Sequence, residues 1–252
     1  MKLLSCFFIV ACLFLSFTIQ SKKKPAKNIK IYFANTVAGE RLLLGKSYTN
    51  PFKEKYTISR LKYYITNVSF KTTQNKVIYE KDSYHLIAET EEGMEVDQTE
   101  FSLSLKPGTY QSISFLIGVD SIKNVSGAQT NALDPLNGMF WAWNTGYIMF
   151  KLEGNSPQSK SLDNKVEYHI GGFKGVNNVL RRVELDLQPQ VIKKGNNTEI
   201  VIKADIDKLW KQGKNIRITE IPVCTTEGTD AVKIADNYSK IFSIHSISTH
   251  KN

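Results

Sequence analysis

Segments in which apolar and polar residues alternate recur along most of the chain. Apolar side chains occupy every second position in sets that begin at Ile29, Leu61, Phe101, Ile113, Val166, Val183 and Ile200. Successive side chains of a β-strand point to opposite faces, so this period of two predicts strands with one buried face. Turn-forming residues such as Pro107-Gly108 separate the sets. We expect about nine to eleven strands, and therefore an all-β antiparallel sandwich or barrel.

Helical spacing is confined to the last fifth of the chain. Residues 205–212 predict one or two turns around Leu209 and Trp210. Residues 230–244 predict a longer C-terminal helix, because their apolar residues recur three and four positions apart. These residues are Ala231, Ile234, Ala235, Tyr238, Ile241 and Phe242. The expected fold is thus β-rich with one C-terminal helix and short helical turns.

The first twenty residues are typical of an export signal. Lys2 precedes an apolar run from Leu3 to Phe17, and a polar, basic segment follows. The run is short for a membrane-spanning helix, which needs about 20 apolar residues, so an uncleaved anchor is the less favoured alternative. Cys12 closes an Ile-Val-Ala-Cys sequence that resembles a lipoprotein cleavage box, so lipidation is a minor alternative.

We therefore divide the chain into three parts. Residues 1–20 are the signal peptide, residues 21–27 a flexible basic N-terminus, and residues 28–252 a single domain. The expected location is the periplasm, the cell envelope or the exterior. Membrane association is expected only through the signal peptide or lipidation.

Cysteine content and charge narrow the class of protein. Two of the three cysteines lie in the predicted signal, so the exported domain keeps only Cys224 and has no internal disulfide. The formal net charge is +9, but the lysines are scattered and no basic stripe accompanies an aromatic run. Nucleic acid is therefore not an expected partner. Glu89, Glu91, Glu92 and Glu95 predict an exposed acidic loop.

Common catalytic motifs are absent from the sequence. There is no G-x-S-x-G, H-E-x-x-H, P-loop or G-x-G-x-x-G pattern. Cys224 has no histidine nearby in the sequence, and we interpret it as a buried structural thiol. The sequence does not predict an enzyme.

The most informative segment contains two of the three tryptophans. Trp141 and Trp143 are two positions apart, which would place both indoles on one face of a strand. Three interpretations remain open: a large aromatic core element, a sugar-stacking surface completed by Tyr147, and a site where a tryptophan is chemically used.

This segment resembles the MbnP-like copper-binding proteins, which are named after a protein of methanobactin biosynthesis cassettes. The resemblance rests on residues in the order Gly118-Val119-Asp120-Ser121, Leu133-Asp134-Pro135, Gly138-Met139-Phe140-Trp141, Trp143, Gly146-Tyr147 and Leu152-Glu153-Gly154. Shorter matching pieces are Leu61-Lys62-Tyr63-Tyr64-Ile65-Thr66-Asn67, Tyr84-His85-Leu86-Ile87 and Tyr168-His169-Ile170-Gly171-Gly172. The resemblance extends from about Ile29 to the C-terminal helix.

The resemblance implies an exported β-rich protein that binds a copper ion. It also implies that a partner di-haem protein related to cytochrome c peroxidases (MbnH-like) can oxidise one tryptophan to kynurenine. Trp141 and Trp143 are the two candidates, and the residues do not decide between them. Kynurenine has an aniline nitrogen and a ketone, whereas an indole offers only an N–H donor.

Histidines are the expected protein ligands, because imidazole suits copper. His85 and His169 lie in segments that match the family, and each is equally well explained as a hydrogen-bonded strand residue. His245 is a reserve, and His250 is expected to be mobile near the terminus. Met139 and Met149 are expected in the core, and Asp120 and Asp134 are expected to cap turns. The competing hypotheses are a carbohydrate- or small-ligand-binding module and a structural envelope protein.

Overall fold

A computed structural model describes residues 27–90, 99–127, 129–141, 143–144 and 146–251. The predicted signal peptide and most of the predicted basic N-terminus lie outside these residues. Of the predicted acidic loop, only Glu89 lies within them. No helix of the described residues has the length and apolar character needed to span a membrane.

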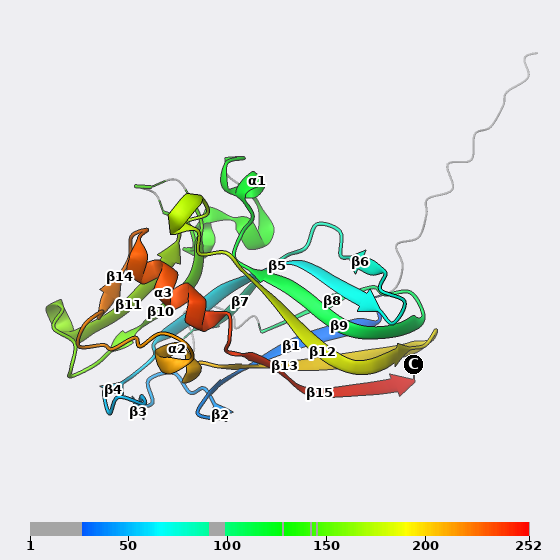
Figure 1. The fold of residues 1–252 in the computed structure, drawn as a ribbon, viewed down its shortest axis with the longest axis horizontal. Helices are drawn as coiled ribbons and strands as arrows, with labels where there is room; N and C mark the ends of the chain where they lie inside the picture. Colours follow the sequence, from blue (N-terminus) through cyan, green and yellow to red (C-terminus); the bar gives the residue numbers. More distant parts are fainter. Residues whose placement is uncertain (1–26, 91–98, 128, 142, 145, 252) are drawn as a thin grey trace, which may run out of the picture.

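Two main sheets make up the protein (Figure 1). A five-stranded sheet has the order β15-β13-β1-β2, and β8 also pairs with β1. Its strands are β1 (Ile29–Val37), β2 (Glu40–Arg41), β8 (Glu100–Leu103), β13 (Asn196–Asp205) and β15 (Phe242–Lys251). A hairpin of β3 (Tyr48–Thr49) and β4 (Lys55–Tyr56) stands beside them.

The eight-stranded sheet has the order β12-β9-β5-β10-β11-β14, and β6 and β7 also pair with β5. Its strands are β5 (Arg60–Thr72), β6 (Val77–Tyr79), β7 (Tyr84–Thr90), β9 (Gly108–Ile117), β10 (Ile148–Asn155), β11 (Lys165–Gly171), β12 (Arg181–Ile192) and β14 (Val223–Cys224). The alternating segments of the sequence all become strands here or in the five-stranded sheet. The all-β sandwich prediction is therefore confirmed, although two strand pairs, β1 with β13 and β11 with β14, are parallel.

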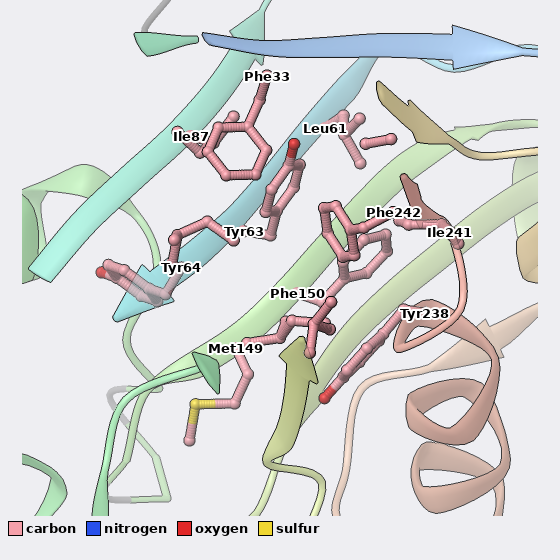
Figure 2. Close-up of a cluster of buried hydrophobic side chains, with 14 of the residues drawn as sticks. Phe33, Leu61, Tyr63, Tyr64, Ile87, Met149, Phe150, Tyr238, Ile241 and Phe242 are labelled. Carbon is pink, nitrogen blue, oxygen red and sulfur yellow. The ribbon is translucent and has the colours of Figure 1, made fainter. Parts of the chain in front are cut away.

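The core lies between the two sheets and is rich in aromatic rings (Figure 2). Phe33 of β1 contacts Tyr63 of β5 and Phe115 of β9, with ring centroids 6.1 and 5.9 Å apart. Phe242 packs edge-on against Phe33 and Tyr63. Edge-to-face pairs of this kind add to the gain from burying the rings. Tyr63 is thus an inner-face residue, and its neighbours Lys62 and Tyr64 point to the outer face.

The predicted C-terminal helix is shorter than the sequence pattern indicated. The helix α3 (Thr229–Tyr238) buries Ala231, Ile234 and Tyr238. The chain then enters β15 at Phe242, which pairs with β13, so pairing with a neighbouring strand outweighs the helical spacing. The predicted turns at residues 205–212 are the short helix α2 (Lys208–Lys211). The remaining helical turns are α1 (Ser121–Asn124), η1 (Asn131–Leu133), η2 (Pro135–Asn137), η3 (Leu162–Asn164) and η4 (Gly175–Asn177).

One edge of β5 is shared by two strands. Residues 60–63 pair with β10, and residues 65–72 pair with β9. β9 ends at Ile117 and β10 begins at Ile148, so both ends of the intervening segment lie near the middle of β5. We call residues 118–147 the tryptophan segment. Its position on the sheet follows directly from this shared edge.

β10 is also tightly flanked by the chain that leads into β5. Thr57 N donates to Asn155 O at 2.8 Å, and Ser59 N donates to Glu153 O at 2.8 Å. A Cβ atom added at Gly154 would lie 1.9 Å from the carbonyl oxygen of Thr57. Only glycine fits at this position.

We expect Gly154→Ala to lower the free energy of unfolding by about 2–3 kcal/mol, because the new methyl group overlaps backbone atoms that cannot rotate away. Urea unfolding followed by circular dichroism measures the change. Gly108→Ala is the matched control, because its Cβ would meet only the Tyr110 side chain, at an ordinary 3.6 Å. Equal stability of the two variants would contradict the expectation.

Candidate metal site beside the tryptophan segment

A buried amide ties the two ends of the tryptophan segment together. The Asn124 side chain donates to Val119 O and accepts from Tyr147 N at 3.0 Å. The hydroxyl of Tyr147 donates to Leu133 O at 2.7 Å, and its ring packs edge-on against Tyr64 of β5. The segment is therefore anchored on the outer face of the eight-stranded sheet.

Two lysines of the sheet also hold this segment. Lys62 of β5 and Lys151 of β10 are only 2% and 9% exposed, and they are paired in the register of these strands. Lys62 Nζ donates to Asn137 O at 3.1 Å, and Lys151 Nζ donates to Gly138 O at 2.6 Å. Burying an ammonium group is costly unless it is hydrogen-bonded. These carbonyl contacts therefore link the segment to the charged part of the sheet.

The two tryptophans occupy different environments. Trp141 is 4% exposed, whereas Trp143 is 64% exposed. Their rings contact each other, with centroids 5.3 Å apart. The expectation that both lie on one face of a strand is wrong, because Trp141 and Trp143 lie outside the strands of the described residues and beside an isolated bridge between Phe140 and Tyr147. Turn formers around the pair break the extended backbone that the alternation requires.

Trp141 lies directly over β11. A Cβ atom at Gly171 would be 2.5 Å from Trp141 Cη2, so the absence of a side chain at Gly171 makes room for the indole. The indole Nε1 of Trp141 is buried and has no hydrogen-bond partner among the described residues. Gly171 is two residues from His169 on the same strand, so His169 points to the same face at a spacing of about 7 Å.

His169 belongs to a compact acidic group. Its Nε2 lies 2.8 Å from Glu153 Oε1 and 3.4 Å from Glu167 Oε1. Candidate ligand atoms of Glu153, Glu167 and His169 all lie within 4.8 Å of one another, which is a geometry that can hold a metal ion. We call these three residues the acid–imidazole cluster. The cluster was not predicted from the sequence apart from His169, because it depends on the register of β10 with β11.

Positive charges surround this cluster. Arg60 Nη1 contacts Glu153 Oε2 at 2.5 Å, and Lys151 Nζ lies 3.6 Å from Glu153 Oε1. Burial raises the pKa of the Glu153 carboxyl, but the hydrogen bond with His169 and the charges of Lys151 and Arg60 outweigh it and lower this pKa to about 2. Burial also lowers the pKa of the Lys151 ammonium, although Glu153 opposes this shift. Glu153 is therefore a fully ionised carboxylate at neutral pH.

His85 lies elsewhere. Its Nε2 is 2.8 Å from Glu80 Oε2, and its ring stacks on Phe101 with centroids 3.5 Å apart. Across the sheet, His169 of β11 pairs with Lys151 of β10, Lys151 pairs with Lys62 of β5, and Lys62 pairs with Ala88 of β7, so these four residues share one face. His85 is three residues from Ala88, so it points to the opposite face. The two predicted histidines do not share one site, and metal binding by each stays a prediction.

The other candidate residues have clear structural roles. His245 and His250 both lie on β15. His250 pairs with Asn197 of β13, so it is part of the sheet rather than of a mobile terminus. Met139 and Met149 are fully buried, as expected. Asp120 caps α1 and Asp134 caps η2, also as expected. Cys224 is buried and free, and burial raises the pKa of its thiol to about 11, which disfavours the reactive thiolate.

Comparisons with known proteins agree with the resemblance seen in the sequence. The family model for MbnP matches residues 26–226. The solved structure of MbnP from Methylosinus trichosporium is similar to this chain, with a TM-score of 0.52 and 14% identity. The match covers 87% of this chain and 97% of that one, and at this identity it shows a shared fold. No curated protein matches the sequence.

The low pKa of Glu153 predicts a pH dependence of stability in the metal-free protein. The folded-state pKa of about 2 lies below the reference value of 4.5, so the stabilisation is complete above about pH 4.5 and is lost as pH falls toward 2. We expect it to be about 2–3 kcal/mol at neutral pH. Unfolding free energies measured in chelator between pH 2 and 7 should converge for wild type and Glu153→Gln near pH 2, separate as pH rises to about 4.5, and differ by a constant amount above that pH.

Glu100→Gln is the control for this measurement. Glu100 pairs with Lys30 at 2.6 Å, but both side chains are nearly half exposed, so little stability is at stake. A constant offset between wild type and Glu153→Gln across the whole pH range would contradict the assigned ionisation.

Proposed function

Because the chain belongs to the MbnP family, we propose that it is an exported copper-binding protein. It binds the metal without catalytic turnover of its own and serves as the substrate of a di-haem, cytochrome c peroxidase-like partner. The observation that carries the proposal is the acid–imidazole cluster, which lies on the same sheet face as the family's tryptophan motif.

The donor atoms of the cluster suit copper in its oxidised state. Imidazole binds copper well, and carboxylate oxygens favour Cu(II) over the softer Cu(I). His169 supplies the nitrogen, and Glu153 and Glu167 supply the oxygens. A copper ion bound by His169 and Glu153 replaces the hydrogen bond between them. Binding therefore releases the proton of that hydrogen bond.

The cationic surroundings set a cost for this site. Arg60, Lys62 and Lys151 carry three positive charges, against two from the carboxylates of Glu153 and Glu167. A divalent ion is therefore bound against a positive local field. A further metal ligand beside the cluster offsets part of this free-energy cost. We propose that a modified Trp141 supplies it through the aniline nitrogen or the ketone of kynurenine.

We propose Trp141 as the modified residue and Trp143 as the contact with the partner. Trp141 lies over Gly171, on the same strand face as His169, and its Nε1 has no hydrogen-bond partner within the described part of the chain. Trp143 is mostly exposed and its ring touches that of Trp141, so a docked oxidant reaches Trp141 through it. At the di-haem partner, two equivalents of hydrogen peroxide are reduced to water, and two oxygen atoms are added with cleavage of the indole C2–C3 bond, which gives N-formylkynurenine. Hydrolysis then releases formate and leaves the aniline nitrogen and ketone of kynurenine.

The carbohydrate-binding alternative loses its main support. Sugar stacking requires accessible rings, but Trp141 and Tyr147 are 4% and 1% exposed. Trp143 alone presents a face. Extended stacking on three rings is therefore not available in this conformation.

The histidine prediction is tested with copper itself. We expect His169→Ala to lower the Cu(II) affinity about ten-fold or more, because it removes the only nitrogen donor of the cluster. Isothermal titration calorimetry with Cu(II), with Zn(II) as competitor, measures the change. His85→Ala is the matched control, since it removes the other partly buried strand histidine, which lies on the opposite face.

The two variants separate the candidate sites. Loss of copper binding in His85→Ala, with wild-type affinity in His169→Ala, would place the metal on the inner face and overturn the proposed cluster. Glu167→Gln, which removes the most exposed of the three ligands, should weaken binding without unfolding the protein.

The tryptophan proposal is tested by peptide mass analysis. After incubation with the purified di-haem partner and peroxide, the peptide that contains residues 141–143 should show the mass shift from tryptophan to kynurenine. Fragment ions should place the shift at Trp141. Trp141→Phe should abolish it, and Trp143→Phe should slow its formation. A shift confined to Trp143 in the wild type would contradict the assignment.

A further inference from the structure

Arg60 differs from the other two cations that surround the acid–imidazole cluster. Lys62 and Lys151 donate to backbone carbonyls of the tryptophan segment. The Arg60 guanidinium makes one hydrogen bond to the described residues, from Nη1 to Glu153 Oε2 at 2.5 Å. The two lysines therefore have a second role in holding the segment, whereas the charge of Arg60 is directed at Glu153 alone.

The strand register places Glu153 between Arg60 and the other members of the cluster. Arg60 lies opposite Glu153 in the pairing of β5 with β10, and Glu153 lies opposite Glu167 in the pairing of β10 with β11. Glu153 is thus the middle residue of a row across three strands. Its Oε2 contacts Arg60, whereas its Oε1 contacts His169. A cation held at the cluster therefore shares this carboxylate with Arg60.

Arg60 lowers the affinity of the cluster for every divalent ion in two ways. It neutralises part of the charge of Glu153, and it adds a positive charge close to the bound ion. The side chains of Arg60 and Glu153 are only 29% and 21% exposed, so salt screens their interaction less than that of a surface pair. Because the effect depends on charge and distance, it is similar for all divalent ions and leaves the ratios of their affinities nearly unchanged.

A uniform loss of affinity still separates strongly bound from weakly bound ions. Calcium uses about six to eight oxygen ligands, whereas the cluster offers two carboxylates and one imidazole. Manganese stands low, and copper high, in the order of affinity that divalent ions follow at nitrogen and oxygen sites. An ion that starts with a weak affinity is therefore left unbound, whereas Cu(II), which gains from the imidazole of His169, is retained.

We propose that Arg60 is a specificity-determining residue of the acid–imidazole cluster, because it prevents weakly bound divalent ions such as Mn(II) and Ca(II) from occupying the site. The inference rests on the proposed copper site and accounts for the selectivity of that site. Without a metal, Arg60 neutralises Glu153. A metal ion takes over part of this role only when its own bonds to the cluster are strong, and His169 supplies such a bond to Cu(II).

Isothermal titration calorimetry of the metal-free protein with Cu(II), Mn(II) and Ca(II) tests the proposal. We expect wild type to bind Cu(II) and to show no saturable binding of the other two ions up to about 1 mM. Arg60→Gln should bind Cu(II) about ten-fold or more tightly, and its binding of Mn(II) or Ca(II) should become measurable. Arg60→Met, which keeps the apolar stem that supports folding, should behave in the same way. Arg60→Lys retains the charge and should retain the wild-type selectivity.

Arg182→Gln is the matched control. It removes the same charge from the same sheet, but Arg182 is exposed on β12 and contacts Ser114, so the metal affinities should stay at their wild-type values. Unchanged or weaker Cu(II) binding in both Arg60→Gln and Arg60→Met would overturn the role of Arg60, while Cu(II) binding by wild type would still support the proposed function. Mn(II) or Ca(II) binding by wild type as tight as by Arg60→Gln would also overturn this role. Absence of Cu(II) binding in wild type and in every Arg60 variant would overturn both proposals.

Discussion

The shared edge of β5 is the constraint on which the candidate metal site depends. A strand edge pairs with one partner at a time, and here β10 occupies residues 60–63 and β9 occupies residues 65–72. The chain between these two strands must leave the sheet where they meet. Gly118 makes the exit with a positive φ of 111°, and a Cβ there would lie 2.6 Å from the Leu180 side chain. The tryptophan segment is thereby delivered to the outer face, above β10 and β11.

Charge burial then connects this segment to the acid–imidazole cluster. Lys62 and Lys151 direct their ammonium groups to carbonyls of the segment, while Lys151 also lies near Glu153. A change in charge at Glu153 therefore acts on a residue that holds the segment in place. The coupling is local, since one side chain contacts both parts. It gives a physical reason why the acid–imidazole cluster and the tryptophan motif occur on one sheet face.

Alternation along the sequence predicted seven of the strands, because each of these has one face in the core and the period of two is a local property. It missed β15, whose first residues have helical spacing. Alternation could not predict whether the two histidines His85 and His169 share a site. His85 and His169 look alike in the sequence, yet the cross-strand register places them on opposite faces. Glu153 and Glu167 carry no local signal, because their proximity arises only when β10 pairs with β11. The spacing of Trp141 and Trp143 misled for a related reason, since period two predicts a common face only where the backbone is extended.

β5 supports the core from one face and the candidate metal site from the other. Tyr63 points inward and donates to Asn35, whereas Lys62 points outward and holds the tryptophan segment. Coupling between distant sites requires an element with two arrangements that both sites bias. Residues 61–66 of β5 are buried, and residues 60–63 are paired on both edges, which leaves no room for a second arrangement there. A metal ion at the cluster should therefore leave β5 and the core behind it unchanged.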